Sequence, residues 1–183
     1  MRNLILLLSR ISLVFAIILL CIAHSCKLPV PEGLTEEEAN AIIEKILKVY
    51  NEGDLALVDE IIAAEYKLHH SAYPEDIVGI EAFKKYITDI RIAFPDMNLK
   101  FDETVVKGFK IIIRWSLTGT NTGNFGELPA TGKQVSYSGL SLSHIADGKF
   151  TQSWIIYNGL ELYQQLGFSI IPPEQETEEE PAM

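Results

Sequence analysis

The hydrophobic pattern of this chain changes its period at Pro95, and this change constrains the fold more than any other feature. Before Pro95, apolar residues recur at three and four positions, the spacing of one helix face. After it they alternate with polar residues, most clearly along 109–118, which is typical of a strand with one buried face. Helices followed by a run of strands predict an α+β fold, in which N-terminal helices pack on a curved antiparallel sheet.

Three helices and four extended segments are expected around this point. Thr35 and Glu38 form a capping box that starts the first helix, and Gly53 ends it. A second helix is expected from Asp54 to about Ala64, and a third from about Gly79 to Ala93, where Pro95 stops it. The expected extended segments are 98–106, 109–118, 134–145 and 150–158. One domain spanning residues 36–170 accommodates all of them.

The N-terminus predicts export. Arg2 and Arg10 precede a largely apolar run, from Ile11 to Ala23, that contains no acidic residue, which is typical of a signal peptide. The small residues before Cys26 resemble a bacterial lipoprotein cleavage site, at which this cysteine is lipidated. We therefore expect residues 1–25 to be a leader, residues 26–35 a spacer, and the protein to be anchored to a bacterial membrane in the cell envelope. The alternative is an uncleaved N-terminal anchor helix.

Charge and composition exclude several partners. Of 15 basic and 25 acidic residues, only Arg2 and Arg10 precede Cys26, so the chain from Cys26 onward carries 13 against 25, a formal net charge of −12. Nucleic acid is not expected as a partner, because phosphate binding needs basic patches. The acidic segment 171–183 is expected to be a disordered tail. With no cysteine after Cys26 and no glycine-rich phosphate loop, neither a metal nor a cofactor is expected.

Motifs near the C-terminus resemble those of the SnoaL-like polyketide and ester cyclases of the nuclear-transport-factor-2-like superfamily. They are Trp154 with Asn158, Leu160 to Gly167, Arg114 to Thr120, and Pro129 to Lys133. The resemblance implies a cone-shaped sheet, a pocket for a small lipophilic carbonyl compound, and a homodimer paired through its sheets. It also implies an aspartate four positions after the tryptophan, where this chain has Asn158, and a histidine on the penultimate strand, which matches His144. Asn121 is a second departure, since relatives often carry histidine there.

The turn around Ala146 to Lys149 decides which residues share a face with His144. A two-residue Asp147-Gly148 turn would place His144 with Thr151, Ser153 and other hydroxyl residues, facing away from Asn158. A three-residue loop with a glycine bulge would place it opposite Phe150. One face would then collect the apolar side chains with His144 and Asn158, and the other would collect the hydroxyls. This segregation favours the bulged register, with the apolar face buried.

The predicted site follows from that register. His144 would be the general base, and Asn158, which cannot titrate, would donate its amide N–H to an oxyanion. His69, Trp115, Leu142 and Trp154 would line the pocket. The alternatives are a hydrogen-bonded core histidine for His144, a surface histidine for His69, and core packing for the two tryptophans. The predicted function is that of a cyclase-type protein, or of a hydrolase, dehydratase or isomerase, acting through an enolate-like intermediate. The alternatives are a noncatalytic small-ligand-binding lipoprotein and a domain that acts through its surface.

Overall fold

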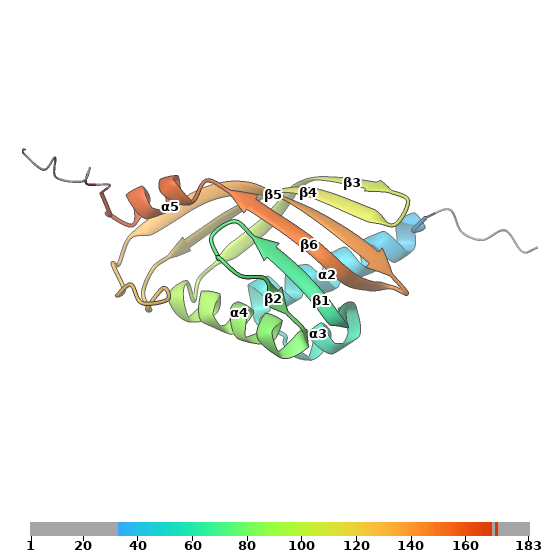
Figure 1. The fold of residues 1–183 in the computed structure, drawn as a ribbon. Coiled ribbons are helices and arrows are strands. Elements are labelled where there is room, and N and C mark those ends of the chain that lie inside the picture. Colours follow the sequence, from blue (N-terminus) through green and yellow to red (C-terminus); the bar gives the residue numbers. More distant parts are fainter. Residues whose placement is uncertain (1–32, 170, 172–183) are drawn as a thin grey trace, which may run out of the picture. The chain divides into compact units, whose positions relative to one another are not determined.

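The chain forms helices packed against one side of a six-stranded sheet (Figure 1), in a computed structural model that describes residues 33–169 and 171. The predicted leader, Cys26 and the tail beyond Ile171 lie outside these residues. None of the described helices is both long and apolar enough to cross a bilayer. The elements in chain order are α2 (Glu36–Glu52), α3 (Ala56–Ile61), β1 (Ile62–His70), β2 (Ile77–Val78), α4 (Ile80–Ala93), β3 (Asn98–Lys107), β4 (Lys110–Thr120), β5 (Gln134–Ala146), β6 (Lys149–Tyr157) and α5 (Gly159–Gln165).

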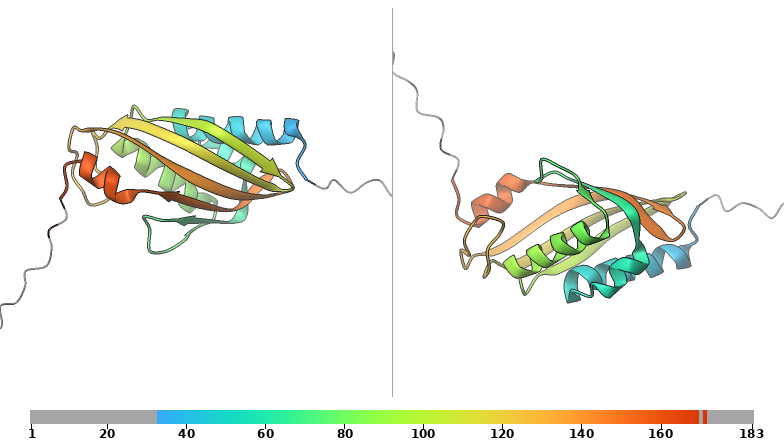
Figure 2. Two further views of the ribbon diagram at one scale, coloured as in Figure 1. Left: turned by 90° about the horizontal axis from the view of Figure 1, so that it is seen from above. Right: turned by 60° about the horizontal axis from the view of Figure 1, so that its bottom comes forward.

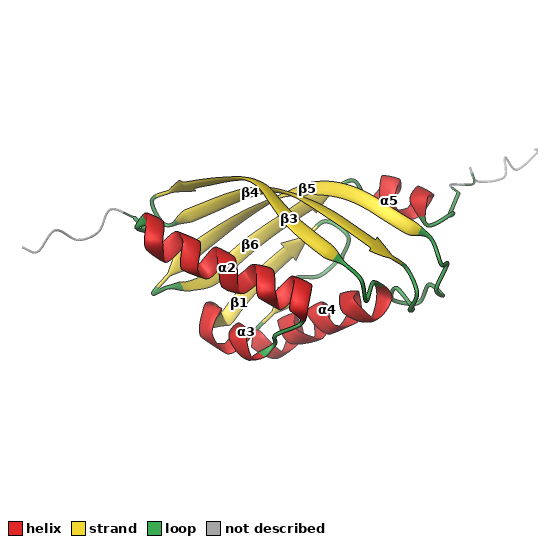
Figure 3. Cartoon of the chain, turned by 180° about the vertical axis from the view of Figure 1, so that it is seen from behind, coloured by secondary structure: helices red, strands yellow, loops and turns green. Residues whose placement is uncertain are grey.

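The predicted α+β class is confirmed. The sheet has the strand order β2-β1-β6-β5-β4-β3, and it curves around α2 and α4, which lie along its concave side (Figures 2 and 3). Every pairing is antiparallel except that of β1 with β6, which is parallel. The expectation of a purely antiparallel sheet is therefore wrong at this one junction.

Helix α2 forms as its sequence predicts. Thr35 accepts a hydrogen bond from the backbone of Glu38 and the Glu38 side chain reaches back, while Gly53 closes the helix with a left-handed φ of 73°. The Asn51 side chain then fastens the last turn to β3, because its Nδ2 donates to the Leu99 carbonyl at 2.9 Å and its Oδ1 accepts from the Leu99 amide at 2.7 Å. Helix α2 is thus fixed to β3, an edge strand of the sheet.

The second helix is shorter than predicted, and the strand after it was not predicted at all. Residues 62–64, expected to be helical, belong to β1 instead. Within β1, Tyr66, Leu68 and His70 are buried, whereas Lys67 is exposed. The two-residue period was present in the sequence, but β1 pairs with β6 some 80 residues away, and such a distant partner overrides local helical preference.

Two register shifts increase the curvature of the sheet. One lies between Phe101 and Glu103 in the pairing of β3 with β4, and the other between His144 and Ile145 in the pairing of β5 with β6. An extra residue on one strand bends that strand and strengthens its twist. The extra residues are Asp102 on β3 and Thr151 on β6, so these two strands bend around an interior that the helices only partly fill.

Candidate functional site

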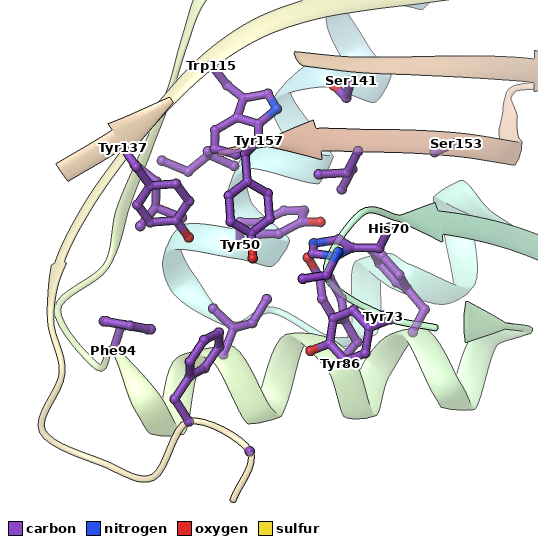
Figure 4. A pocket seen from close by; sticks show the side chains of 18 of the residues that line it. Tyr50, His70, Tyr73, Tyr86, Phe94, Trp115, Tyr137, Ser141, Ser153 and Tyr157 are labelled. Atoms are coloured by element: carbon purple, nitrogen blue, oxygen red, sulfur yellow. The ribbon is translucent and has the colours of Figure 1, made fainter. Parts of the chain in front are cut away.

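A cavity of about 1260 Å³ lies between the concave side of the sheet and helices α2 and α4. Its walls come from nearly every element, and segments 72–74, 125–128, α5 and residues 168–169 contribute to its lining beyond the sheet and helices. All seven tyrosines of the chain line it: Tyr50, Tyr66, Tyr73, Tyr86, Tyr137, Tyr157 and Tyr163. Figure 4 shows several of these rings converging on one space. The shape and lining suit a small ligand with aromatic and oxygen-bearing groups.

The tyrosine hydroxyls are neutral hydrogen-bonding groups. Burial raises the pKa of Tyr157 to about 12, and burial also raises the pKa of Tyr50, Tyr66, Tyr86 and Tyr137 above the ordinary value. Tyr50 and Tyr86 lie next to each other, with ring centroids 6.5 Å apart. At neutral pH the tyrosines can therefore orient a ligand, but they do not act as bases.

The inner side of the last hairpin is lined by serines. Ser141, Ser143 and Ser153 all line the cavity, and the Ser143 and Ser153 hydroxyls lie 2.8 Å apart. Tyr66 of β1 also lines the cavity, so hydroxyls from three strands face the same space. The neighbouring cavity residue of β6, Ile155, is the direct cross-strand partner of Ser141.

His70 is the one histidine among the residues that line the cavity. It is 9% exposed, and burial lowers its pKa to about 4, so its imidazole is neutral at physiological pH. The lining contains no lysine and no arginine, and its single carboxylate belongs to Glu127, which is exposed. The cavity therefore offers hydrogen-bond donors and aromatic rings without an internal charge. Within the described residues, no three histidine, cysteine, aspartate or glutamate side chains are placed to hold a metal ion.

The predicted register of the last hairpin is wrong. Asp147 and Gly148, with φ of 50° and 70°, form a two-residue turn, and the bulge lies at Thr151, between the pairs His144–Gln152 and Ile145–Phe150. The predicted segregation of side chains nevertheless exists, because the skipped Thr151 shifts the rest of β6 by one residue relative to β5. The assignment of the two faces is reversed: the serine face lines the cavity, and the apolar face is the outer side of the sheet.

The predicted pocket residues are divided by this reversal. Trp115 lines the cavity, whereas His69, Leu142 and Trp154 are not among its lining residues. On the outer side, the indole of Trp154 lies between two imidazoles, stacked on His69 at 4.9 Å and edge-on to His144 at 5.2 Å. His69 is held there by Asp76 at 2.6 Å and by Gln152 at 2.7 Å.

The predicted catalytic pair is not assembled either. His144 is on the outer face, opposite Gln152, and is absent from the cavity lining. Asn158 is exposed and caps α5, because its Oδ1 accepts a hydrogen bond from the Glu161 amide at 3.2 Å. A catalytic role for either residue stays an untested prediction, and this geometry gives it no cavity in which to act.

Asn121 is buried behind the loop that contributes residues 125–128 to the cavity lining. Its side chain is 1% exposed; Nδ2 donates to the carbonyls of Ala93 and Gly123, and Oδ1 accepts from the amide and hydroxyl of Thr131. These bonds close the loop that carries the lining residues 125–128. Asn121 therefore supports the cavity wall without lining it.

His70 and the tyrosines were missed as site residues for an identifiable reason. The alternation Tyr66, Leu68, His70 could have shown that His70, rather than His69, shares a face with buried residues. The tyrosines could have been noticed only as a set, because each one alone is an ordinary core residue.

Comparison with known proteins gives a consistent assignment. Residues 40–166 match the family model described as SnoaL-like polyketide cyclase. The chain is 32% identical over 140 residues to aklanonic acid methyl ester cyclase DnrD of Streptomyces peucetius, covering 73% of this chain and 93% of that relative. It is 31% identical to DauD, the cyclase of the same description from Streptomyces sp. strain C5, covering 73% and 84%.

A solved structure agrees with the sequence relatives. TsrD from Streptomyces laurentii superimposes with a TM-score of 0.67 at 31% identity, covering 74% of this chain and 98% of that one. On these grounds the chain belongs to the SnoaL-like polyketide cyclase family.

Proposed function

We propose that this protein binds a neutral, lipophilic, carbonyl-bearing molecule in its cavity and does so without an acid–base pair. The observation that carries the proposal is the lining itself: aromatic rings and hydroxyls surround the space, while its titratable groups are the neutral His70, the tyrosines and the exposed Glu127. A ligand carbonyl can accept hydrogen bonds from such a wall, and its apolar surface can pack on the rings.

The absence of a cavity-facing base on the last two strands favours binding over cyclisation. Ser141 and Ile155 are direct neighbours across β5 and β6 and both line the cavity, yet neither side chain can act as a general base at neutral pH. Proton abstraction next to a carbonyl needs a positioned base, and such a group typically contributes about 10²–10⁴ in rate. The two named relatives are cyclases of a methyl ester; this chain is proposed to bind a comparable neutral carbonyl compound.

The two tryptophans of the chain allow a direct binding test. Trp115 lines the cavity and Trp154 lies on the outer face, so Trp154→Phe leaves one fluorophore inside and Trp115→Phe leaves one outside. Anthraquinone is a suitable neutral probe. Saturable quenching in the Trp154→Phe protein, with none in the Trp115→Phe protein, is expected. Equal quenching in both, or none in either, would contradict binding in the cavity.

A gain-of-function experiment separates binding from catalysis. Ser141→His with Ile155→Asp places an imidazole and a carboxylate side by side in the cavity, whereas Asn158→Asp adds a carboxylate outside it. The readout is deuterium exchange at the carbon between the two carbonyls of an aryl β-diketone. We expect no acceleration by the native protein or by Asn158→Asp, and a clear acceleration by the double variant. Acceleration by the native protein would establish it as a catalyst.

We also propose a homodimer formed through the outer face of the sheet. Supporting this, Val105, Ile112, Leu140 and Ile156 on that face are 47%, 42%, 53% and 63% exposed, and exposed apolar side chains that share one face are typical of an interaction surface. Leu140→Glu with Ile156→Glu should convert a dimer to a monomer in light scattering. Ile92→Glu, at a residue 56% exposed on α4, is the matched control and should change nothing.

The membrane anchor is a separate proposal. Arg2, Arg10 and the apolar run before Cys26 support lipidation of this cysteine, which would hold the binding domain at the cell envelope. Expressed in a bacterial host, the native protein should fractionate with membranes and gain the mass of a lipid at Cys26. Cys26→Ala should lose both properties, and retention of the unprocessed leader would instead support an uncleaved anchor.

A further inference from the structure

The two ring nitrogens of His70 have different surroundings. Nδ1 accepts a hydrogen bond from the backbone amide of Ala72 at 3.3 Å. Nε2 has no hydrogen-bond partner among the described residues. Every fully buried side-chain nitrogen or oxygen of these residues does have a partner, so Nε2 is not fully buried. Since His70 lines the cavity, Nε2 is available there to a ligand (Figure 4).

We propose that His70 determines ligand specificity by presenting a fixed Nε2–H to the cavity, where it selects a neutral molecule with a carbonyl oxygen at that point. This inference rests on the proposed binding function and adds the residue that recognises the carbonyl. It assigns His70 a positioning role in recognition and no proton transfer.

The tautomer follows from the hydrogen bond to Ala72. A neutral imidazole has one N–H and one lone pair, and Nδ1 must offer its lone pair to the Ala72 amide. The proton is then on Nε2. Because burial lowers the pKa of His70 to about 4, this neutral form persists across the physiological range.

The orientation of the ring is fixed by three tyrosines from three different elements. The imidazole centroid lies 4.9 Å from that of Tyr73, 5.5 Å from Tyr86 on α4, and 5.5 Å from Tyr157 on β6. All three rings meet it at steep angles of 65–72°, so a ring flip would displace them. No charged side chain is among these contacts.

A fixed neutral donor distinguishes three kinds of ligand. A carbonyl oxygen accepts the hydrogen bond from Nε2–H. A hydrocarbon of the same shape would exclude water from Nε2–H without accepting that bond, and a donor left without a partner costs binding free energy. A carboxylate would also accept the bond, but it would bring a charge into a cavity whose lining has no cation to balance it. Ketones and quinones are therefore favoured over both hydrocarbons and free acids.

Anthraquinone and anthracene form a matched pair of probes, because they share a planar tricyclic shape and only the former has carbonyls. Affinities are measured by Trp115 quenching in the Trp154→Phe background. The native cavity should bind anthraquinone more tightly than anthracene. His70→Phe keeps a ring in the tyrosine cluster but removes the donor, so it should weaken anthraquinone binding about 10-fold, as expected for one lost hydrogen bond, and leave anthracene unchanged. His69→Phe, the same substitution at the neighbouring histidine on the outer face, is the control and should leave both affinities unchanged.

The outcomes separate this inference from the proposed function. Binding of neither probe would refute both. Equal binding of both probes, or a parallel loss of both in His70→Phe, would refute the role of His70 while leaving the cavity as a binding site. Long-range proton–nitrogen NMR correlations of His70 provide an independent check: a proton on Nε2 is expected at pH 7, with its resonance shifted when anthraquinone binds, and a proton on Nδ1 would overturn the proposal.

Discussion

Replacing Asn121 by alanine should destabilise the protein far more than replacing Asn158, although both are asparagines in or next to loops. Asn121→Ala removes four hydrogen bonds at once. The Ala93 carbonyl would remain satisfied, because it also accepts from the amides of Thr122 at 3.1 Å and Gly123 at 3.3 Å. The Gly123 carbonyl and the Thr131 amide would lose the 2.8 Å bonds that they make to Asn121.

The size of the effect follows from these two backbone groups. A polar group left unpaired in a buried place costs about 1–3 kcal/mol. Gly123 and Thr131 are only half-buried, so water can partly replace the lost partner, and the lower end of the range applies. We expect a loss of about 2–3 kcal/mol in the free energy of unfolding, which for a domain of this size corresponds to a fall of about 5–10 °C in Tm.

Urea unfolding followed by circular dichroism measures this difference. Asn158→Ala is the matched control: it removes one exposed N-cap bond of 3.2 Å, and N-cap losses typically cost about 1 kcal/mol, less for a short helix such as α5. If Asn121→Ala were no more destabilising than Asn158→Ala, the closure of the loop by the Asn121 side chain would be refuted. The variant should also bind anthraquinone more weakly, because residues 125–128 would no longer be held at the cavity.

Three further predictions concern the cavity. The folded-state pKa of His70, about 4, lies below the ordinary value of about 6.5, so between these two pH values the imidazole is protonated only in the unfolded chain. The neutral His70 therefore stabilises the fold fully above pH 6.5, and acidification should lower the free energy of unfolding by about 3 kcal/mol in all. Urea unfolding from pH 4 to pH 7 should show this decline in the native protein and not in His70→Phe. A Cβ on Gly139 would clash with Cζ2 of Trp115 and would lie 2.6 Å from the Ile156 carbonyl oxygen, so Gly139→Ala should cost about 1–3 kcal/mol and shift the Trp115 emission. An unchanged spectrum and stability would contradict this packing. The carboxylate derivative of anthraquinone should bind at least about 10-fold more weakly than anthraquinone itself, because no cation lines the cavity; equal affinity in the quenching assay would contradict a charge-free interior.

Local signals in the sequence identified most of the framework. The capping box at Thr35, the left-handed Gly53 and the proline after α4 act within a few residues of each boundary, so the boundaries of α2 and α4 follow from short-range chemistry. Strand β1 depends instead on a parallel pairing with β6, a contact that no neighbouring residue specifies. The parallel junction could not be anticipated for the same reason.

The site was harder to predict because its position depends on one bulged residue. The skipped Thr151 moves every residue of β6 from Gln152 onward by one place relative to β5. The segregation of apolar and hydroxyl side chains was recoverable from the sequence, but the location of the bulge and the side that faces inward were not. His69 and His70 show the same limit, since adjacent strand residues point to opposite faces and only the surrounding burial tells which one reaches the cavity.

The reversal of the two faces has a physical reason. Choosing the more apolar face as the buried one assumes that burial means packing against other side chains, which holds for a filled core. A sheet that encloses a cavity has different requirements, because the inner wall must satisfy polar groups of a ligand or of water, and serines and tyrosines serve there. Leucine and isoleucine on the outer side are then exposed in a single chain, and a second protein surface is what would make that exposure favourable. The hydroxyl-rich interior and the apolar exterior are therefore separate expectations: loss of the outer apolar residues should abolish pairing and leave anthraquinone binding intact, whereas loss of the His70 donor should weaken binding and leave pairing intact.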